Sequence, residues 1–195
     1  SQGYYPIKGL HYMLEALGDI RKFYPDARLR VAGGVSLNNA GLKNRLKQKN
    51  YQRYLAELIE KYSLAGCVEF LPPLKADEMK KMYLKSNVFV SPSSIENSPN
   101  SLGEAMMLGV PCVSSLVGGV GNMLINGAEG FTYQHDAPYM LAYYVMEIFR
   151  LQKENRQQLA DMTDMAHSHA MSLFDSEKNA ANMLEIYSGI ERIKR

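Results

Sequence analysis

The residues VFVSPSSIENSPNSLGEAMM, at positions 88–107, place an apolar strand, a polar loop and a helix start in direct succession. The loop carries Glu96, and a helix is expected to begin near Ser101, with Glu104 in its first turn. Seven residues separate the two carboxylates. Hydroxyls, amides, two acids and the positive end of a helix therefore meet within a short segment. This combination suits a ligand with many hydroxyl groups and a negatively charged diphosphate, such as a nucleotide-sugar.

Around this segment, short apolar runs alternate with helical patterns. The runs that predict strands are residues 29–32, 68–71, 88–91, 111–114 and 130–133. The helical patterns cover residues 10–20, 42–62, 77–85, 101–108, 138–151, 156–169 and 176–193, with a short helix after the glycine pair at 118–119. Continuous apolar strands that are each followed by a helix are typical of a parallel sheet covered on both faces.

The sequence therefore predicts an α/β fold, a Rossmann-like doubly wound parallel sheet with helices on both faces. In such folds the ligand crevice lies at the carboxyl ends of the strands. Lys8, Gly33-Gly34, Pro72-Pro73 and the Glu96 loop all fall at strand-to-helix junctions. We expect them to share one edge of the sheet.

Length and composition fit one globular domain covering residues 1–195. Hydrophobic residues make up 46% and charged residues 22%, which is the ordinary globular range. The net charge of +2 is too weak to indicate a nucleic-acid partner. The first helical pattern starts within ten residues of the N-terminus, so a strand that should precede it is expected to be clipped.

The cysteines and histidines give no pattern of a metal site or of nucleophilic catalysis. Cys67 and Cys112 lie far apart in apolar surroundings, and we expect both to be buried free thiols in a reducing compartment. The four histidines are scattered, and none is near a cysteine in the sequence. We therefore predict no metal site.

Five segments, in this order, resemble the C-terminal, donor-binding half of a GT-B glycosyltransferase of family 4. They are Ile7-Lys8-Gly9-Leu10, LRVAGG at 29–34, VEFLPPL at 68–74, VFVSPSSIENSPNSLGEAMMLGVPCVSSLVGGV at 88–120 and AEGFTY at 128–133. The most specific part is the pair of glutamates separated by seven residues. The similarity covers nearly the whole chain.

The resemblance implies a retaining transferase with a nucleotide-diphosphate sugar donor, a UDP- or GDP-sugar, and no required metal or cofactor. It also implies transfer of a hexose-type sugar to a glycan or glycolipid, as in polysaccharide biosynthesis. The acceptor would be bound largely by an N-terminal domain that is absent here. The resemblance further suggests a cytoplasmic protein that could lie at the inner face of the membrane, with peripheral membrane contact in the full protein.

The same resemblance assigns roles to individual residues. Lys8 would bind the diphosphate and stabilise charge on the departing phosphate, Glu96 would face the hydroxyls of the donor sugar, and Glu104 would accept hydrogen bonds from the ribose. Gly33 would let the ligand approach the backbone closely. The backbone that would approach the sugar and diphosphate belongs to Asn97, Ser98, Pro99, Asn100 and Ser101.

Simpler roles for these residues remain open. Ser101 and Glu104 also fit a capping box, in which the serine hydroxyl and the glutamate carboxylate satisfy each other's backbone amides. Glu96 and Lys8 could be solvated surface charges. Gln2 stands where the family usually has an arginine six residues before the lysine. That departure favours a non-catalytic nucleotide- or sugar-binding module, and a sugar-nucleotide epimerase of GT-B architecture is a further alternative.

Overall fold

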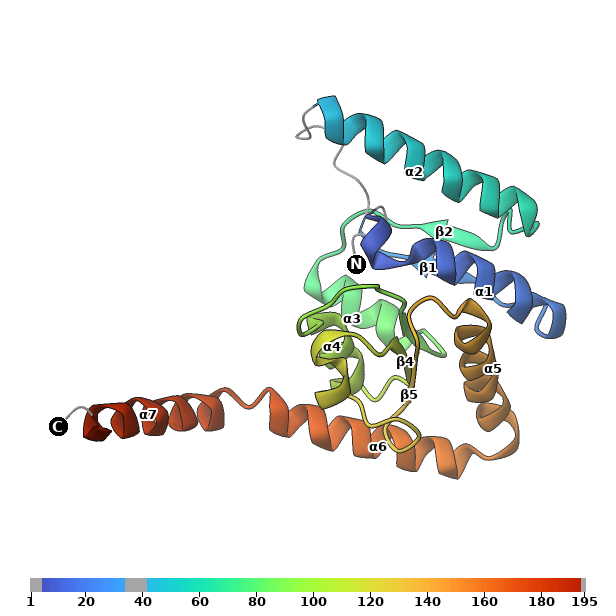
Figure 1. Ribbon diagram of the computed structural model, residues 1–195. Coiled ribbons are helices and arrows are strands. Elements are labelled where there is room, and N and C mark those ends of the chain that lie inside the picture. The colour runs from blue at the N-terminus through green and yellow to red at the C-terminus, as the bar shows by residue number, and fades with distance from the viewer. Residues whose placement is uncertain (1–4, 34–41, 194–195) are drawn as a thin grey trace.

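The computed structural model describes residues 5–33 and 42–193, with the backbone alone for 42–49 and 191–193 (Figure 1). Gln2 and Gly34, which the sequence analysis singled out, lie outside the described residues. The elements are, in chain order, η1 (Pro6–Lys8), α1 (Leu10–Phe23), β1 (Leu29–Val31), α2 (Leu42–Lys61), β2 (Val68–Phe70), α3 (Ala76–Leu84), β3 (Phe89–Ser91), α4 (Asn100–Met107), β4 (Cys112–Ser115), η2 (Gly118–Asn122), β5 (Phe131–Tyr133), α5 (Pro138–Glu154), α6 (Arg156–Leu173) and α7 (Ser176–Ile193).

All the paired strands run parallel, as predicted. β1 pairs with β2, and β3, β4 and β5 form a second group in that order. The registers place Leu29 opposite Val68 and Phe89 opposite Cys112. The predicted α/β fold with parallel strands flanked by helices is confirmed. The hydrogen bonds divide the strands into two sheets.

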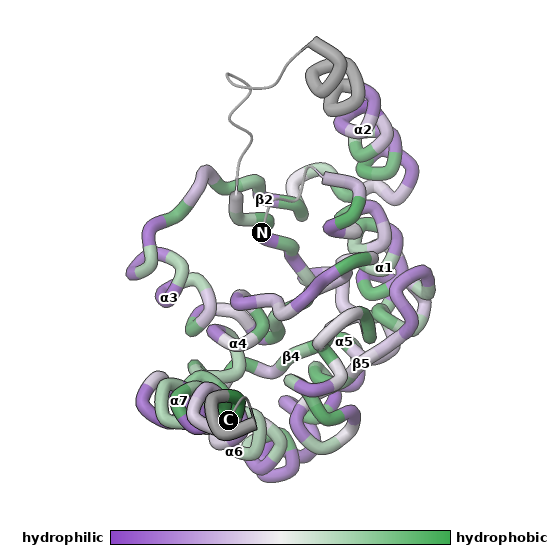
Figure 2. Tube along the Cα trace, turned by 60° about the vertical axis from the view of Figure 1, so that its left-hand side comes forward, coloured by the Kyte–Doolittle hydropathy of each residue, from purple (hydrophilic) through white to green (hydrophobic). Residues whose placement is uncertain are grey.

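Two buried clusters cover opposite faces of the strands. In β4, the side chain of Val113 joins a cluster with residues of α1, α2 and α5, whereas its neighbour Cys112 joins a cluster with residues of α3, α4 and α6. Successive side chains of a strand point to opposite faces, so the two clusters lie on either side of the sheet. Figure 2 shows α3 and α4 on one side of β4 and α1 and α5 on the other.

Helix α1 forms because its apolar residues recur at helical spacing. Leu10, Met13, Leu14, Leu17 and Ile20 are all buried, as the sequence predicted. The helix packs extensively against α5. Its first turn is therefore held firmly over the sheet.

The start of α1 lies against the loop that follows β3. Gly9 has a φ of 69°, and a Cβ atom built on it would lie 1.8 Å from the carbonyl oxygen of Pro92. In the same region the backbone N–H of Ser94 donates a hydrogen bond of 2.8 Å to the carbonyl oxygen of Ile7. This close backbone contact brings η1, which contains Lys8, to the carboxyl end of β3.

The loop after β3 is supported from its other side by η2. A Cβ atom at Gly118 would lie 1.6 Å from the carbonyl oxygen of Glu96, and one at Gly119 would lie 2.3 Å from that of Asn97. The N–H of Gly119 donates a 2.8 Å hydrogen bond to the Asn97 carbonyl. Two glycines are needed here because backbone packs directly on backbone. We assigned this pair no function from the sequence.

Three expectations from the sequence are corrected. Helix α4 begins at Asn100 with Pro99 as its N-cap, so Ser101 lies inside the helix and the alternative capping box does not form. Glu104 consequently lies in the second turn, not the first. Cys67 is only partly buried, because it immediately precedes β2, which lies at an edge of its sheet. Cys112 is buried, and both thiols are free.

The contact between Gly118 and Glu96 can be tested by adding one methyl group. Gly118 and Gly127 both have positive φ angles, of 51° and 80°, but a Cβ atom at Gly127 meets nothing within 4 Å. We expect Gly127→Ala to lower the free energy of unfolding by about 1 kcal/mol, the cost of the left-handed backbone alone. Gly118→Ala should cost about 3 kcal/mol, because the backbone at Glu96 must also move. Urea denaturation measures both, and equal losses would contradict the packing described.

Candidate functional site

Lys8 and Glu96 form an ion pair at the carboxyl end of β3. The Nζ atom of Lys8 lies 2.6 Å from Oε1 of Glu96, and the side chains are 26% and 15% exposed. The hydroxyl of Ser93 donates to the same carboxylate oxygen at 2.7 Å. The structure thus joins two predicted site residues that are 88 positions apart in the sequence. Both described donors use Oε1, and the pair is neither fully buried nor fully solvated.

The loop that carries Glu96 is held by buried hydroxyl groups. Ser115, at the end of β4, donates hydrogen bonds to the backbone carbonyls of Ser93 and Ser91. Ser115 and Ser93 are both buried. These contacts fix the loop backbone on the sheet, so the Glu96 carboxylate is positioned before any ligand arrives. Neither serine was singled out from the sequence, which gave no signal beyond hydroxyl groups near the strand ends.

The segment after Glu96 presents polar groups around the start of α4. Asn97, Ser98 and Asn100 are exposed, and Pro99 is buried. The carbonyl of Pro99 accepts the N–H groups of residues 102 and 103, the first hydrogen bonds of the helix. The amides at positions 100 and 101 precede those bonds, as at any helix start. They point the positive end of the helix dipole towards the loop, and the first turn contains no acid that would neutralise it.

Glu104 is positioned by a side chain from another helix. Its Oε2 atom accepts a 3.0 Å hydrogen bond from the hydroxyl of Tyr83 in α3. That hydroxyl also lies 3.3 Å from the carbonyl oxygen of Ser101. Burial, and secondarily the negative charge of Glu104, raise the pKa of Tyr83 well above its ordinary range, so the phenol remains a donor. No motif in the sequence points to this role of Tyr83.

The predicted site residues are brought together to different degrees. Lys8 and Glu96 touch, and Lys8 and Ser101 line one cavity of about 390 Å³. Gly33 follows β1 and therefore lies at the carboxyl end of a parallel strand, as expected. Its φ angle is 99°. The described contacts do not link Gly33 or Glu104 directly to the Lys8–Glu96 pair.

The described part of the chain contains no group of three or more histidine, cysteine, aspartate or glutamate residues that could hold a metal ion. Within the same part, none of the helices combines the length and the apolar character needed to cross a membrane.

The chemistry of the site follows from these groups. A lysine ammonium and the free amides of a helix start attract an anion such as phosphate. Carboxylate oxygens accept hydrogen bonds from hydroxyl groups, and two acceptors on one carboxylate match neighbouring hydroxyls. Glu96 and the amides at the start of α4 follow β3, and the Lys8 ammonium is held against Glu96.

The sequence is similar to that of a family of known enzymes. The profile of the family described as glycosyl transferases group 1 matches residues 3–163. The D-inositol 3-phosphate glycosyltransferase of Corynebacterium urealyticum is 27% identical over 186 residues, covering 94% of this chain and 41% of that protein. The enzyme of the same name from Paenarthrobacter aurescens is 30% identical, covering 93% and 41%.

Solved structures give the same result for the fold. The chain superposes on sucrose-phosphate synthase from Thermosynechococcus elongatus with a TM-score of 0.76 at 20% identity, covering 97% of this chain and 44% of that one. It superposes on Anabaena HepE in complex with UDP with a TM-score of 0.77 at 22% identity, covering 94% and 46%. The chain therefore spans less than half the length of these relatives. It belongs to the group 1 glycosyltransferases and has the fold of the C-terminal half of a GT-B enzyme.

Proposed function

We propose that this chain binds the nucleotide-sugar donor of a retaining glycosyltransferase of family 4, with a UDP- or GDP-sugar as donor. The observation that carries the proposal is the contact between Lys8 and Glu96, beside the start of α4. A cation for phosphate and an acceptor for sugar hydroxyls are thus held side by side. Structures of the related Anabaena HepE with UDP and with UDP-glucose support this class of ligand.

Each part of the donor has a group suited to it. Glu104, held by Tyr83, would accept hydrogen bonds from the ribose. Lys8 and the amides at the start of α4 would bind the diphosphate, and Glu96 would fix the sugar ring. An ammonium group has three donor hydrogens, so Lys8 can keep its bond to Glu96 while it binds a phosphate oxygen.

The reaction would depend on charge stabilisation. Negative charge grows on the diphosphate as the bond to the sugar breaks, and pre-oriented amides with a lysine stabilise that charge without reorganisation. We assign no general base, because in retaining members the departing phosphate is thought to take the acceptor's proton during attack from the front side. The acceptor would be a glycan or glycolipid bound largely by an N-terminal half, at the cytoplasmic side of a membrane.

A non-catalytic nucleotide-sugar-binding module is the second candidate. Gln2, in place of an arginine, is the observation that favours it, since half of the positive clamp would be missing. Both candidates require donor binding. Calorimetry of the folded chain with UDP, GDP and ADP is therefore the first experiment. A folded chain that binds none of the three nucleotides would rule out both functions.

If Glu104 binds the ribose, its substitution should weaken the binding of a nucleoside and of the nucleoside diphosphate equally. Using the base that binds best, we expect Glu104→Gln to weaken the nucleoside and the nucleoside diphosphate by a similar factor of about ten. Calorimetry measures both affinities. The control is Tyr83→Phe, which keeps the carboxylate and removes its anchor, and should have the smaller effect. A loss confined to the diphosphate would contradict the ribose role.

If Lys8 binds the diphosphate, its substitution should weaken the binding of the nucleoside diphosphate more than that of the nucleoside. We expect Lys8→Met to weaken the nucleoside diphosphate about tenfold or more and to leave the nucleoside unchanged, because only the diphosphate carries the charge that Lys8 meets. Lys22→Met is the matched control, since Lys22 pairs with Asp19 on the exposed side of α1. If Lys8→Met weakens both ligands equally, its effect comes from the fold and not from the phosphate.

If Glu96 binds the donor sugar, its substitution should reduce the preference for the sugar conjugate over the free nucleoside diphosphate. We expect Glu96→Gln to preserve or increase affinity for the nucleoside diphosphate, because Lys8 loses a competing anion. The gain in affinity that the attached sugar supplies should fall about tenfold, since a neutral amide is a weaker acceptor for hydroxyl groups. Competition between the diphosphate and its sugar conjugate measures the difference. An unchanged sugar preference would rule out this role.

A further inference from the structure

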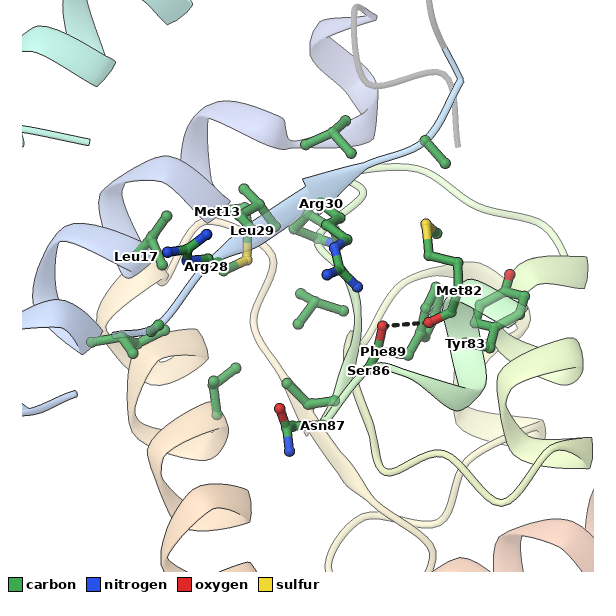
Figure 3. Close-up of a pocket in the computed structure, with 18 of the residues that line it drawn as sticks. Met13, Leu17, Arg28, Leu29, Arg30, Met82, Tyr83, Ser86, Asn87 and Phe89 are labelled. Atoms are coloured by element: carbon green, nitrogen blue, oxygen red, sulfur yellow. Dashed lines mark hydrogen bonds between the residues drawn. The ribbon is translucent and has the colours of Figure 1, made fainter. Parts of the chain in front are cut away.

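A buried hydroxyl group lies behind the Glu96 carboxylate. Ser93 is 3% exposed, and its Oγ atom donates a hydrogen bond of 2.7 Å to Oε1 of Glu96. The ammonium group of Lys8 bonds to the same oxygen at 2.6 Å. Lys8 also lines the cavity of about 390 Å³ that β1 and β3 border, whereas Ser93 does not line it (Figure 3). The two donors therefore reach one oxygen from different parts of the structure.

The other oxygen of this carboxylate is available to a ligand. Within the described part of the chain, both donors to Glu96 use Oε1 and none bonds to Oε2. Oε2 is also not among the buried polar atoms that lack a partner there, so it is open to solvent. Because Oε1 already accepts two hydrogen bonds, most of the remaining acceptor capacity of the carboxylate belongs to Oε2. Glu96 thus presents one defined oxygen to the outside.

The backbone around Ser93 is held in place, and this fixes the position of its hydroxyl. The hydroxyl of Ser115, at the end of β4, donates a hydrogen bond to the backbone carbonyl of Ser93. One residue earlier, the carbonyl oxygen of Pro92 packs directly against Gly9. A chain of contacts thus runs from Ser115 through Ser93 to Glu96. Because Ser93 cannot move with the carboxylate, its hydroxyl resists any rotation of that group.

The ion pair with Lys8 constrains the carboxylate less strictly than the hydroxyl does. An ammonium group is a compact charge at the end of a flexible stem, and its three donor hydrogens can follow a carboxylate that turns. A hydroxyl on a short, buried side chain donates in a narrow range of directions. The orientation of the Glu96 carboxylate is therefore determined mainly by Ser93, and its charge is balanced by Lys8.

We propose that Ser93 is a positioning residue for the donor sugar: its hydroxyl holds Oε1 of Glu96, so that Oε2 faces the hydroxyl groups of the sugar. The inference rests on the proposed function and deepens it, because it assigns sugar recognition to one oxygen and its orientation to a residue behind it. Ser93 acts through Glu96 and does not touch the donor. Loss of its hydroxyl should therefore affect binding of the sugar and leave binding of the diphosphate to Lys8 and the α4 amides intact.

Calorimetry of a Ser93→Ala variant tests this role. The measured quantity is the sugar ratio, which is the affinity for a nucleotide-sugar divided by the affinity for the matching nucleoside diphosphate. The probes are UDP, GDP and ADP with their glucose and mannose conjugates, and the pair that binds best is used throughout. We expect Ser93→Ala to lower the sugar ratio about fivefold and to change the affinity for the diphosphate by less than about twofold.

Two further variants separate positioning from a general effect on the fold. The matched control is Ser114→Ala, because Ser114 is also buried, and its hydroxyl bonds to the backbone carbonyl of Ser115 and not to Glu96. Urea denaturation should show similar decreases in stability for both serine variants, whereas Ser114→Ala should leave the sugar ratio unchanged. In a Glu96→Ala background, Ser93→Ala should lower the sugar ratio no further, since no carboxylate remains to be positioned. If Ser93→Ala does not fold, Ser93→Cys keeps the volume with a weaker donor and should give a smaller loss.

The outcomes distinguish this role from the proposed function. A folded wild-type chain that binds none of the diphosphates would overturn both. An unchanged sugar ratio in folded Ser93→Ala would overturn the positioning role alone, because the wild-type chain would still bind its donor. Equal losses for the diphosphate and its sugar conjugate, a similar fall of the ratio in Ser114→Ala, or a further fall in the Glu96→Ala background would also overturn it. Each of these results would mean that the Ser93 hydroxyl does not act through Glu96.

Discussion

The ion pair between Lys8 and Glu96 is the contact on which the rest of the site depends. It connects the turn before α1 to the loop after β3, and it exists because backbone meets backbone at Gly9 and Pro92 and at Ile7 and Ser94. The pair is partly shielded from water, which strengthens its attraction relative to a surface pair. In the function that we propose, a donor phosphate would meet a lysine whose position is already fixed, which would reduce the entropy lost on binding.

Much of the positioning of the Lys8–Glu96 pair comes from glycines, which have no side chain. Gly9, Gly118 and Gly119 each sit where a Cβ atom would collide with a carbonyl oxygen of the Glu96 loop. The loop is therefore clamped between η1 and η2 by peptide groups, and the hydroxyl of Ser115 ties it to β4. A rigid loop is suited to holding a carboxylate against a cation, because the alternative, a mobile loop, would let both charges return to water.

The direction of the strands determines on which side of the sheet the connecting loops lie. All the paired strands run parallel, so the loops that follow β3, β4 and β5 emerge on the same side of their sheet. β1 and β3 are not paired with each other, and residues of both strands line the same cavity.

Local patterns in the sequence determined the elements of this protein. The spacing of apolar residues in α1, the apolar runs of β3 and β4 and the glycines at turns each reflect interactions within a few residues, and the predicted parallel α/β fold followed from their order. The tertiary structure alone decided the rest. It paired Lys8 with Glu96, gave Glu104 a partner in Tyr83 and placed Pro99 at the N-cap of α4, so that the alternative capping box does not form. It also left a cavity of about 390 Å³ that is lined by residues of both β1 and β3. These features depend on which distant strands and helices become neighbours, and nearby residues in a sequence do not encode that choice.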